Sequence, residues 1–385
     1  MGKVVDRRYG SIARIFLISF SLLQGIQAYA QKLELRIGFI APLSGDLADI
    51  GASTREGAEL AIEQVNAAGG LLIGGRAYTA VLVVRDGQSR PEIAVNAAQE
   101  LINREHVAAI IGPPISGTAI PVARLADKSR IPMITQVATV PEVTKGMRYV
   151  FRVCYTDDFQ GKVLARFVRE RLSAATAAVL FDVAGAYNKT VAEIFAAEFR
   201  EAGGRIVAEE TYTTGTQDFR SQLLRIKSRS PDVLFLPNYA ADLRIQLDQI
   251  RELKIQAQIV GTDTMSFRDA ANIAKSEGAY FSTHFSPEIP ETAVQDFARL
   301  YQRTFNRTVT VGGALTYDAL GLLFDALKRA GNVDPEAVAE ALRSTLRYEG
   351  VTGVMEFAGS PDPKKSVVIL RVQNLQARFF SRIDP

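Results

Sequence analysis

Segments with the composition of buried strands alternate with amphipathic helical segments along most of this chain. The first pair is the apolar stretch 35–41 and residues 54–67, in which apolar side chains recur at every third or fourth position. Gly69 and Gly70 follow that helix and are typical of a helix C-terminus. Strands separated by helices pair in parallel, because the helix returns the chain to the same end of the sheet. The alternation therefore predicts an α/β fold with parallel sheets.

The order of these segments occurs twice. Each half has a strand, a helix that ends in Gly-Gly, a second strand, another helix and a buried strand, with the glycine pairs at 69–70 and 203–204. A chain of 385 residues also exceeds what one hydrophobic core usually holds. We therefore expect two lobes around a cleft, joined by crossings near 152–157 and 281–286. The expected first lobe comprises residues 31–153 and 285–355, and the second comprises residues 154–284 and 356–385.

The first thirty residues have the features of an export signal. Four basic side chains precede a short apolar run at 15–23, and Ala28-Tyr29-Ala30 is a small-x-small cleavage site. Because a membrane span needs about 20 apolar residues, a cleaved signal is favoured over a retained anchor. We expect cleavage near Ala30, a chain that starts at Gln31, and a location in the periplasm.

Charge and cysteine content exclude several kinds of partner and of stabilisation. The net charge of +3 belongs to the first thirty residues, since they carry four basic residues and Asp6. The remainder is neutral and gives no reason to expect nucleic acid or an anionic membrane as a partner. Cys154 is the only cysteine, so no internal disulfide can form. Stability must therefore rest on packed cores.

No pattern typical of an enzyme is visible. The two histidines, His106 and His284, form neither a metal-binding motif nor part of a Ser-His-Asp set, and each is expected to be a satisfied structural side chain. The first strand is followed by no Gly-x-Gly-x-x-Gly motif, and no Walker loop occurs. Cys154 is expected to pack beside a crossing. We therefore expect no catalysis, no metal and no cofactor.

One loop has the properties of an anion site. Residues 112–118 follow a predicted strand at 108–111 and open a helix, so Ser116 is expected as its N-cap beside free backbone N–H groups. A carboxylate there would accept hydrogen bonds from these donors and interact favourably with the helix dipole. Thr139 leaves the following strand at the same edge and offers a second hydroxyl. Local sequence also allows purely structural roles, with Ser116 as a cap and Thr139 as a turn residue.

Several spaced segments resemble the branched-chain amino-acid (Leu/Ile/Val) binding proteins of ABC importers, which have the periplasmic-binding protein type I fold. The resemblance covers nearly all of residues 33–375. The segments are IGFIAPLSGDLADIG, EGAELAIEQVNAAGG, IIGPPISGTAIPVA, IPMITQVATVPEVT, FRVCYTDDFQG and TQDFRSQL. The resemblance implies two Rossmann-like lobes with parallel sheets around a cleft, joined by hinge crossings.

The resemblance also implies which residues hold the ligand. The carboxylate and ammonium of an amino acid would be held by the loop serine, by an Ala-x-Thr-like segment, by two tyrosines and by an acidic residue. At matching positions these are Ser116, Val137, Ala138, Thr139, Tyr187, Tyr239 and Asp263. The side-chain pocket departs from the family, because Ile50 replaces a tyrosine and Phe159 precedes Gln160.

The ligand class stays open between two alternatives. An aliphatic amino acid is favoured by the retained acidic group at Asp263, although aspartate is shorter than the usual glutamate of the family. An aromatic or other small carboxylate is the alternative. The resemblance further implies a monomer that closes by hinge bending and delivers its ligand to an inner-membrane ABC permease. A ligand-sensing subunit of a membrane receptor shares the same fold.

Overall fold

Two large sheets organise the chain in the computed structural model, which describes Met1, residues 33–265 and residues 270–385. The first sheet contains six strands, and β1, β4, β5 and β6 run parallel. A hairpin pairs β2 with β3 in the antiparallel sense at one edge. In sheet order the strands are β2 (Leu71–Ile73), β3 (Arg76–Asp86), β1 (Leu33–Ala41), β4 (Ala109–Ile111), β5 (Met133–Thr135) and β6 (Val150–Arg152).

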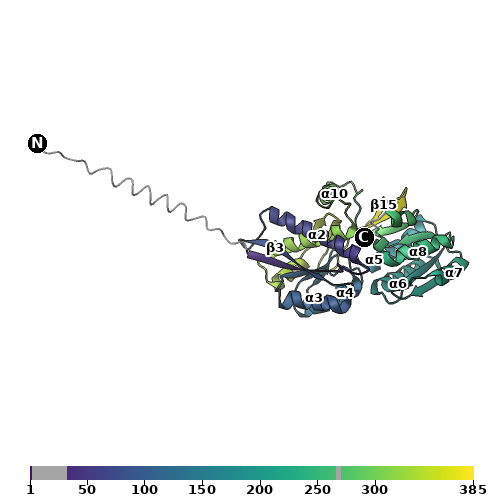
Figure 1. The fold of residues 1–385 in the computed structure, drawn as a ribbon, viewed down its shortest axis with the longest axis horizontal. Helices are drawn as coiled ribbons and strands as arrows, with labels where there is room; N and C mark the ends of the chain where they lie inside the picture. Colours follow the sequence, from purple (N-terminus) through teal and green to yellow (C-terminus); the bar gives the residue numbers. More distant parts are fainter. Residues whose placement is uncertain (2–32, 266–269) are drawn as a thin grey trace. The chain divides into compact units, whose positions relative to one another are not determined.

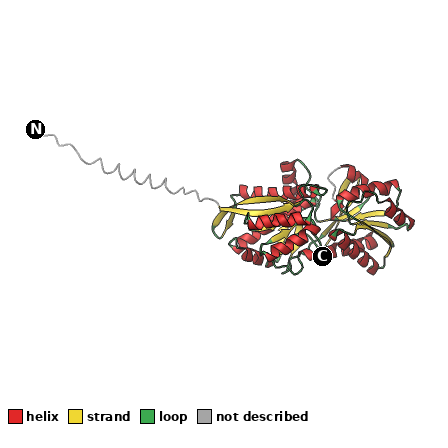
Figure 2. Cartoon of the chain, turned by 60° about the horizontal axis from the view of Figure 1, so that its bottom comes forward, coloured by secondary structure: helices red, strands yellow, loops and turns green. Residues whose placement is uncertain are grey.

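Helices cover both faces of the first sheet (Figures 1 and 2). Alternate strand residues explain why: Ile110 packs in one apolar cluster with α3 (Pro91–Asn103) and α4 (Ser116–Lys128), and Ile111 packs in another with α2 (Ala48–Ala67) and α11 (Val311–Ala330). Successive strand side chains point to opposite faces, so a short buried strand serves both layers. The helix α12 (Pro335–Arg343) joins the second cluster.

The close contact of α2 with α11 depends on glycine. A Cβ atom on Gly57 would lie 2.1 Å from the carbonyl oxygen of Gly313, which no real side chain allows. Two facing glycines therefore let the backbones approach closely.

The second sheet contains seven strands. Five of them, β7, β8, β9, β10 and β11, run parallel, and β14 and β15 extend the sheet in the antiparallel sense. In sheet order they are β15 (Gln376–Ile383), β14 (Val367–Gln373), β11 (Tyr280–Thr283), β10 (Gln258–Gly261), β9 (Val233–Leu236), β7 (Thr176–Asp182) and β8 (Arg205–Tyr212).

The second sheet also lies between helical layers. The helices α5 (Asp157–Arg166) and α6 (Ala186–Glu201) lie side by side, as Figure 1 shows, and their apolar side chains meet Val179 and Phe235. On the other face α7 (Arg220–Ser228) and α8 (Ala240–Glu252) cover Leu180 and Leu234. The short helix α9 (Ala270–Lys275) follows the segment 266–269.

The chain passes between the two sheets more than once. It leaves the first sheet after β6 and returns after β11, by way of α10 (Thr292–Phe305), to α11. A small hairpin follows, formed by β12 (Arg347–Gly350) and β13 (Gly353–Glu356). After this hairpin the chain crosses again to the second sheet and enters β14. Two of these crossings meet at Arg152. Its buried guanidinium lies 2.6 Å from the carboxylate of Asp362 and donates to the carbonyl oxygens of Ala138 and Val140.

Several expected element boundaries were wrong. The helix expected at 54–67 begins at Ala48, because residues preceding the apolar pattern already continue the same helix. The helix expected at 161–172, after the first crossing, begins at Asp157 and continues as a π-helical segment, Phe167–Arg171. The strands β2, β12 and β15 and the helix α12 were not anticipated.

The export signal and its cleavage site lie outside the described residues, since residues 2–32 are not described. In the described part of the chain, no helix has the length and apolar composition to cross a membrane.

Candidate ligand-binding site

A cavity of about 80 Å³ lies where loops from both sheets meet. Most of these loops follow the carboxyl ends of parallel strands: Ser116 follows β4, Val137 follows β5, Tyr239 follows β9 and Asp263 follows β10. This edge is where open α/β sheets bind ligands. The lining residues are Asp49, Ile50, Ser53, Pro114, Ile115, Ser116, Val137, Tyr187, Tyr239, Ala240, Arg244, Asp263, Thr264, Thr310, Val311 and Gly312.

The N-terminus of α4 supplies donors to this cavity. Ser116 is the first helical residue and Ile115 occupies the N-cap position with extended backbone, so the expectation that Ser116 is the N-cap was wrong by one residue. Ile115 has no polar side chain, so no side chain accepts a hydrogen bond from the first N–H groups of α4. Among the described residues, neither the N–H groups of Ser116 and Gly117 nor the Ser116 hydroxyl has a hydrogen-bond partner. An anion can therefore accept from three donors here.

Two tyrosines form the opposite wall. Tyr187 was expected just before a helix at 189–202, but α6 begins at Ala186, so Tyr187 lies in its first turn. Tyr239 is the N-cap residue of α8. Their ring centroids are 5.4 Å apart with an interplanar angle of 39°. Burial, followed by the charge of Asp263, raises the pKa of both phenols, so both are neutral donors near pH 7.

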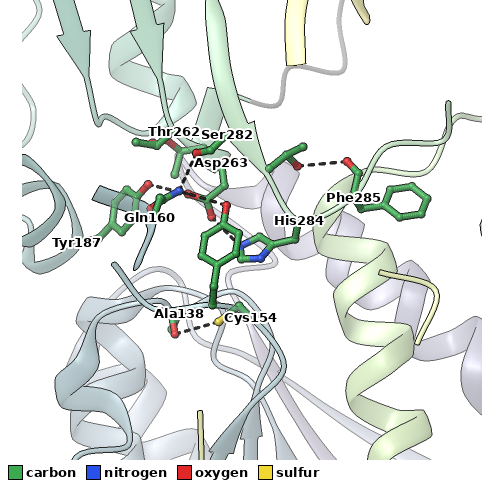
Figure 3. Close-up of polar contacts among 12 residues, drawn as sticks. Ala138, Cys154, Gln160, Tyr187, Thr262, Asp263, Ser282, His284 and Phe285 are labelled. Carbon is green, nitrogen blue, oxygen red and sulfur yellow. Dashed lines mark hydrogen bonds and ion pairs between the residues drawn. The ribbon is translucent and has the colours of Figure 1, made fainter. Parts of the chain in front are cut away.

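Asp263 is a buried carboxylate with several protein donors. Its Oδ1 accepts a hydrogen bond of 2.8 Å from Gln160 Nε2 and one of 2.7 Å from the Tyr187 hydroxyl. Figure 3 shows these side chains converging on one point from different elements. Burial favours the neutral acid, but the facing His284 and these hydrogen bonds outweigh it and hold the pKa of Asp263 below its ordinary value. Asp263 is therefore ionised.

His284 was not expected at this site. Its Nε2 lies 3.4 Å from Asp263 Oδ2, and its ring stacks on Tyr155 with centroids 3.6 Å apart. The expectation of a satisfied side chain was wrong, because neither ring nitrogen makes a hydrogen bond to the described residues. Burial lowers the pKa of His284 to about 4, so the imidazole is neutral near pH 7 and faces Asp263 with a nitrogen rather than a positive charge. His284 directly follows β11, which pairs in parallel with β10, so the strand-end rule could have placed it beside Asp263.

Three expected site residues do not line the cavity. The carbonyl oxygen of Ala138 already accepts from Arg152 and from the Cys154 thiol, so it faces the hinge side of its loop. Thr139 is fully buried, and its hydroxyl has no hydrogen-bond partner in the described part of the chain. Phe159 packs edge-on against Tyr155 at 6.5 Å between ring centroids. The remaining six, Ile50, Ser116, Val137, Tyr187, Tyr239 and Asp263, are brought together.

Sequence reasoning missed several polar members of the cavity wall. Arg244 and Asp49, on helices that cover different sheets, form an ion pair of 2.9 Å. Ser53 and Thr310 contact each other through their hydroxyl groups. None of these residues follows a strand directly, so the strand-end rule did not select them.

No candidate metal site occurs among the described residues. Nowhere in residues 33–265 and 270–385 do three or more His, Cys, Asp or Glu side chains gather as a metal site would require. Cys154 is buried as expected, and burial raises the pKa of its thiol to about 12, which makes it a poor nucleophile.

Comparison with known proteins agrees with this fold. The family model described as "Periplasmic binding protein" matches residues 34–368. A relative from Rhizobium johnstonii, the Leu/Ile/Val-binding protein BraC3, is 29% identical over 334 residues, which cover 86% of this chain and 89% of that protein.

Solved structures are similar over almost the whole chain. The leucine-binding protein LivK from Thermotoga maritima has a TM-score of 0.85 and 31% identity, with 91% of this chain and 99% of that chain covered. LivJ from Streptococcus pneumoniae, a branched-chain amino acid transporter substrate-binding protein in complex with isoleucine, has a TM-score of 0.84 and 30% identity, with 92% and 100% covered.

Proposed function

Because this chain belongs to the periplasmic binding protein family, we propose that it is the solute-binding protein of an ABC importer and binds an aliphatic amino acid, a branched-chain one above all. The observation that carries the proposal is the pairing of opposite polar groups across one cavity. Unpartnered N–H donors of α4 lie in one wall, and the ionised Asp263 lies in the other. A zwitterion presents a matching carboxylate and ammonium.

Each side chain then has a role in holding the ligand. Ser116 and the adjacent N–H groups donate hydrogen bonds to the ligand carboxylate, and Asp263 accepts a hydrogen bond from its ammonium. Tyr187 and Tyr239 cover the polar end, and Ile50 and Val137 contact the aliphatic side chain. Thr139, Ala138 and Phe159 act from behind the wall by shaping the loop and the ring stack on which the cavity rests.

Closure of two lobes is the proposed mechanism. The lobes are residues 31–153 with 285–355 and residues 154–284 with 356–385. Support comes from the sheets, since the strands of the first lie within 33–152 and those of the second within 176–283 and 367–383. Bending at the crossings brings the walls together around the ligand, and a membrane permease recognises the closed form. The protein acts in the periplasm after cleavage near Ala30, as a monomer and without catalysis.

A second candidate ligand is a small carboxylate without an amine. It is favoured by one observation: Asp263 Oδ1 already accepts from Gln160 and Tyr187, so its capacity for a ligand ammonium is reduced. The two candidates differ only in the amino group, which makes leucine and 4-methylpentanoate, its analogue without the amine, a matched pair of probes.

Calorimetric titration of the refolded protein, produced from Gln31 onward, tests the proposal. Leucine, isoleucine or valine is expected to bind, and at about 100 times its Kd to stabilise the fold by about 2.7 kcal/mol. Asp263→Asn is expected to weaken leucine binding by roughly tenfold or more, because a charged hydrogen bond is lost, and to leave 4-methylpentanoate binding nearly unchanged. Binding of carboxylates alone would replace the ligand class, and binding of neither would refute the proposed function.

A further inference from the structure

His284 is a buried polar side chain beside the cavity whose nitrogens the fold alone does not explain. It is 1% exposed, and neither ring nitrogen makes a hydrogen bond to the described residues. Burying such atoms costs free energy, and a hydrocarbon ring would fill the same space without that cost. The nitrogen that faces another polar group is Nε2, which lies 3.4 Å from Oδ2 of Asp263. The function of His284 is therefore to be sought at this carboxylate.

The pairing of β10 with β11 brings His284 to Asp263. In the parallel register Gly261 lies opposite Phe281, so Asp263 and His284 leave the sheet at the same edge, two and three residues further on. The imidazole stacks on Tyr155 with ring centroids 3.6 Å apart and an interplanar angle of 24°. Tyr155 is also buried, so its ring holds the imidazole in one orientation.

Asp263 is contacted at each of its two oxygens. Oδ1 accepts from Gln160 Nε2 at 2.8 Å and from the Tyr187 hydroxyl at 2.7 Å, whereas Oδ2 faces His284. Figure 3 shows Tyr187 and His284 reaching Asp263 from different sides. Tyr187 lines the cavity together with Asp263, and Gln160 and His284 lie behind this wall. Contacts at both oxygens fix the rotation of the carboxylate, with Oδ1 on the side of Tyr187.

The same strand end supports both oxygens of Asp263. The amide nitrogen of Gln160 also donates to the Ser282 hydroxyl of β11 at 2.9 Å. Ser282 and His284 are two residues apart, the spacing that places strand side chains on one face. Ser282 therefore acts on Oδ1 through Gln160, and His284 acts on Oδ2 directly.

A neutral imidazole is suited to stabilise this carboxylate. It carries one N–H, and a carboxylate facing Nε2 favours the tautomer with the proton on that atom. The 3.4 Å contact is longer than an ordinary hydrogen bond, but in a buried site the N–H dipole still stabilises the charge. Burial raises the pKa of Asp263, and His284 is the strongest of the influences that lower it. His284 thus favours the ionised form, which an ammonium requires.

We propose that His284 is a positioning residue for the amino group of the ligand: its Nε2 fixes the Asp263 carboxylate at the cavity wall and thereby makes the site prefer amino acids to carboxylic acids that lack an amine. The inference rests on the proposed function, because it requires a ligand that carries an amine. His284 does not touch the ligand and transfers no proton. The donors at the N-terminus of α4 do not depend on it, so binding of the deaminated analogue reports on the rest of the site.

The preference for an amine is measured as the ratio of the Kd values of 4-methylpentanoate and leucine, each from calorimetric titration. The wild type is expected to prefer leucine by roughly tenfold or more. His284→Phe keeps a ring that stacks on Tyr155 and removes both nitrogens. It is expected to lower the ratio by about fivefold or more and to change 4-methylpentanoate binding less than about twofold. Equal weakening of both ligands would assign His284 a structural role only, and an unchanged ratio would show that Asp263 does not need it; either result overturns the inference.

A rescue variant separates the nitrogen from the ring. His284→Gln offers an amide N–H close to the position of Nε2 and is expected to keep the ratio within about threefold of the wild type. His106→Gln is the matched control, because His106 is exposed between α3 and β4, and both ligands should bind it as they bind the wild type. A glutamine variant at 284 that prefers leucine no more than His284→Phe does would overturn the inference.

The same titrations distinguish this inference from the proposed function. A wild-type preference for leucine that survives in His284→Phe would overturn the role of His284 and leave the proposed function intact. Failure of the wild type to bind leucine would overturn both.

Discussion

The Nη2 atom of Arg244 lies 2.9 Å from Oδ2 of Asp49, and both side chains line the same cavity. Arg244 is on α8, which packs on the second sheet, and Asp49 is on α2, which packs on the first. The ion pair therefore joins the two halves directly at the cavity wall. A contact of this kind forms only when the halves are together, so it contributes to the equilibrium between open and closed states.

Asp49→Asn is expected to weaken leucine binding by about two- to fivefold, since partly exposed ion pairs contribute roughly 0.2–1 kcal/mol. The difference from the wild type should shrink at high salt, which screens exposed charges. Titration at low and high ionic strength measures both effects. Glu59→Gln is the control, because Glu59 pairs with Arg55 within α2 alone. Equal effects of the two substitutions would contradict a role in joining the halves.

Ser116→Ala removes one donor at the N-terminus of α4. It is expected to weaken leucine and 4-methylpentanoate equally, by about fivefold, because a hydrogen bond contributes about 1 kcal/mol and both ligands carry the carboxylate. Calorimetric titration with the two ligands checks the equality. Ser129→Ala, at the other end of the same helix, should bind both ligands as the wild type does. A loss confined to leucine would place the ligand in the reverse orientation.

His284 predicts a pH dependence of stability. Its pKa is lowered to about 4 in the folded protein from 6.5, so the unfolded chain binds more protons between these values and stability rises with pH across that window. When the pH falls through the whole window, the protonation of His284 lowers the free energy of unfolding by about 3 kcal/mol. The pKa of Asp157 is raised, so its effect on stability has the opposite sign and stability falls as the pH rises through that pKa. The pKa of Asp263 is lowered, so its contribution to stability is lost only at a pH below the ordinary range of an aspartate.

The comparison that isolates His284 is urea unfolding of the wild type and of His284→Asn at pH 4.5 and pH 7. The stability of the variant is expected to fall less on acidification, so the gap between the two proteins narrows at pH 4.5. His106→Asn is the control, since His106 is exposed in the segment between α3 and β4 and is not among the residues that line the cavity. A gap of the same size at both pH values would contradict the prediction.

Gly57→Ala is expected to destabilise the fold by roughly 1–3 kcal/mol, because the added methyl group would overlap the carbonyl of Gly313 and push α2 away from α11. The midpoint of urea unfolding measures the loss. Gly117→Ala is the matched control: it also lies in a helix, nothing lies within 4 Å of the added atom, and alanine should stabilise by up to about 1 kcal/mol. Similar effects of the two changes would argue against close helix contact.

The strand-helix alternation was sufficient to predict the fold class, and together with the family resemblance it selected six of the residues that line the cavity. Ser116 and Asp263, which follow parallel strands, could be placed because topology brings strand ends to one edge. The antiparallel edge of the second sheet was harder to predict from the sequence. The strands β14 and β15 are joined by a short turn, and no helix between them marks where one strand ends and the next begins.

Side chains that reach the site from helices could not be predicted in the same way. Arg244 and Asp49 meet because two helices on different sheets face each other, and no sequence period encodes that distance. Asp157 is one of two adjacent acids at the start of α5, and only burial separates it from Asp158. Protonation depends on such burial, so the contrast between Asp157 and Asp263 follows from the three-dimensional structure alone.

The order in which the chain visits the sheets has a consequence for folding during synthesis. The first sheet is complete at Arg152, but the helix α11 that covers one of its faces ends at Ala330, and the second sheet receives β14 and β15 after residue 366. A growing chain therefore carries two unfinished cores until most of its residues have been made. Neither half can fold to completion ahead of the other, and both are expected to become resistant to proteases at almost the same late point in chain growth.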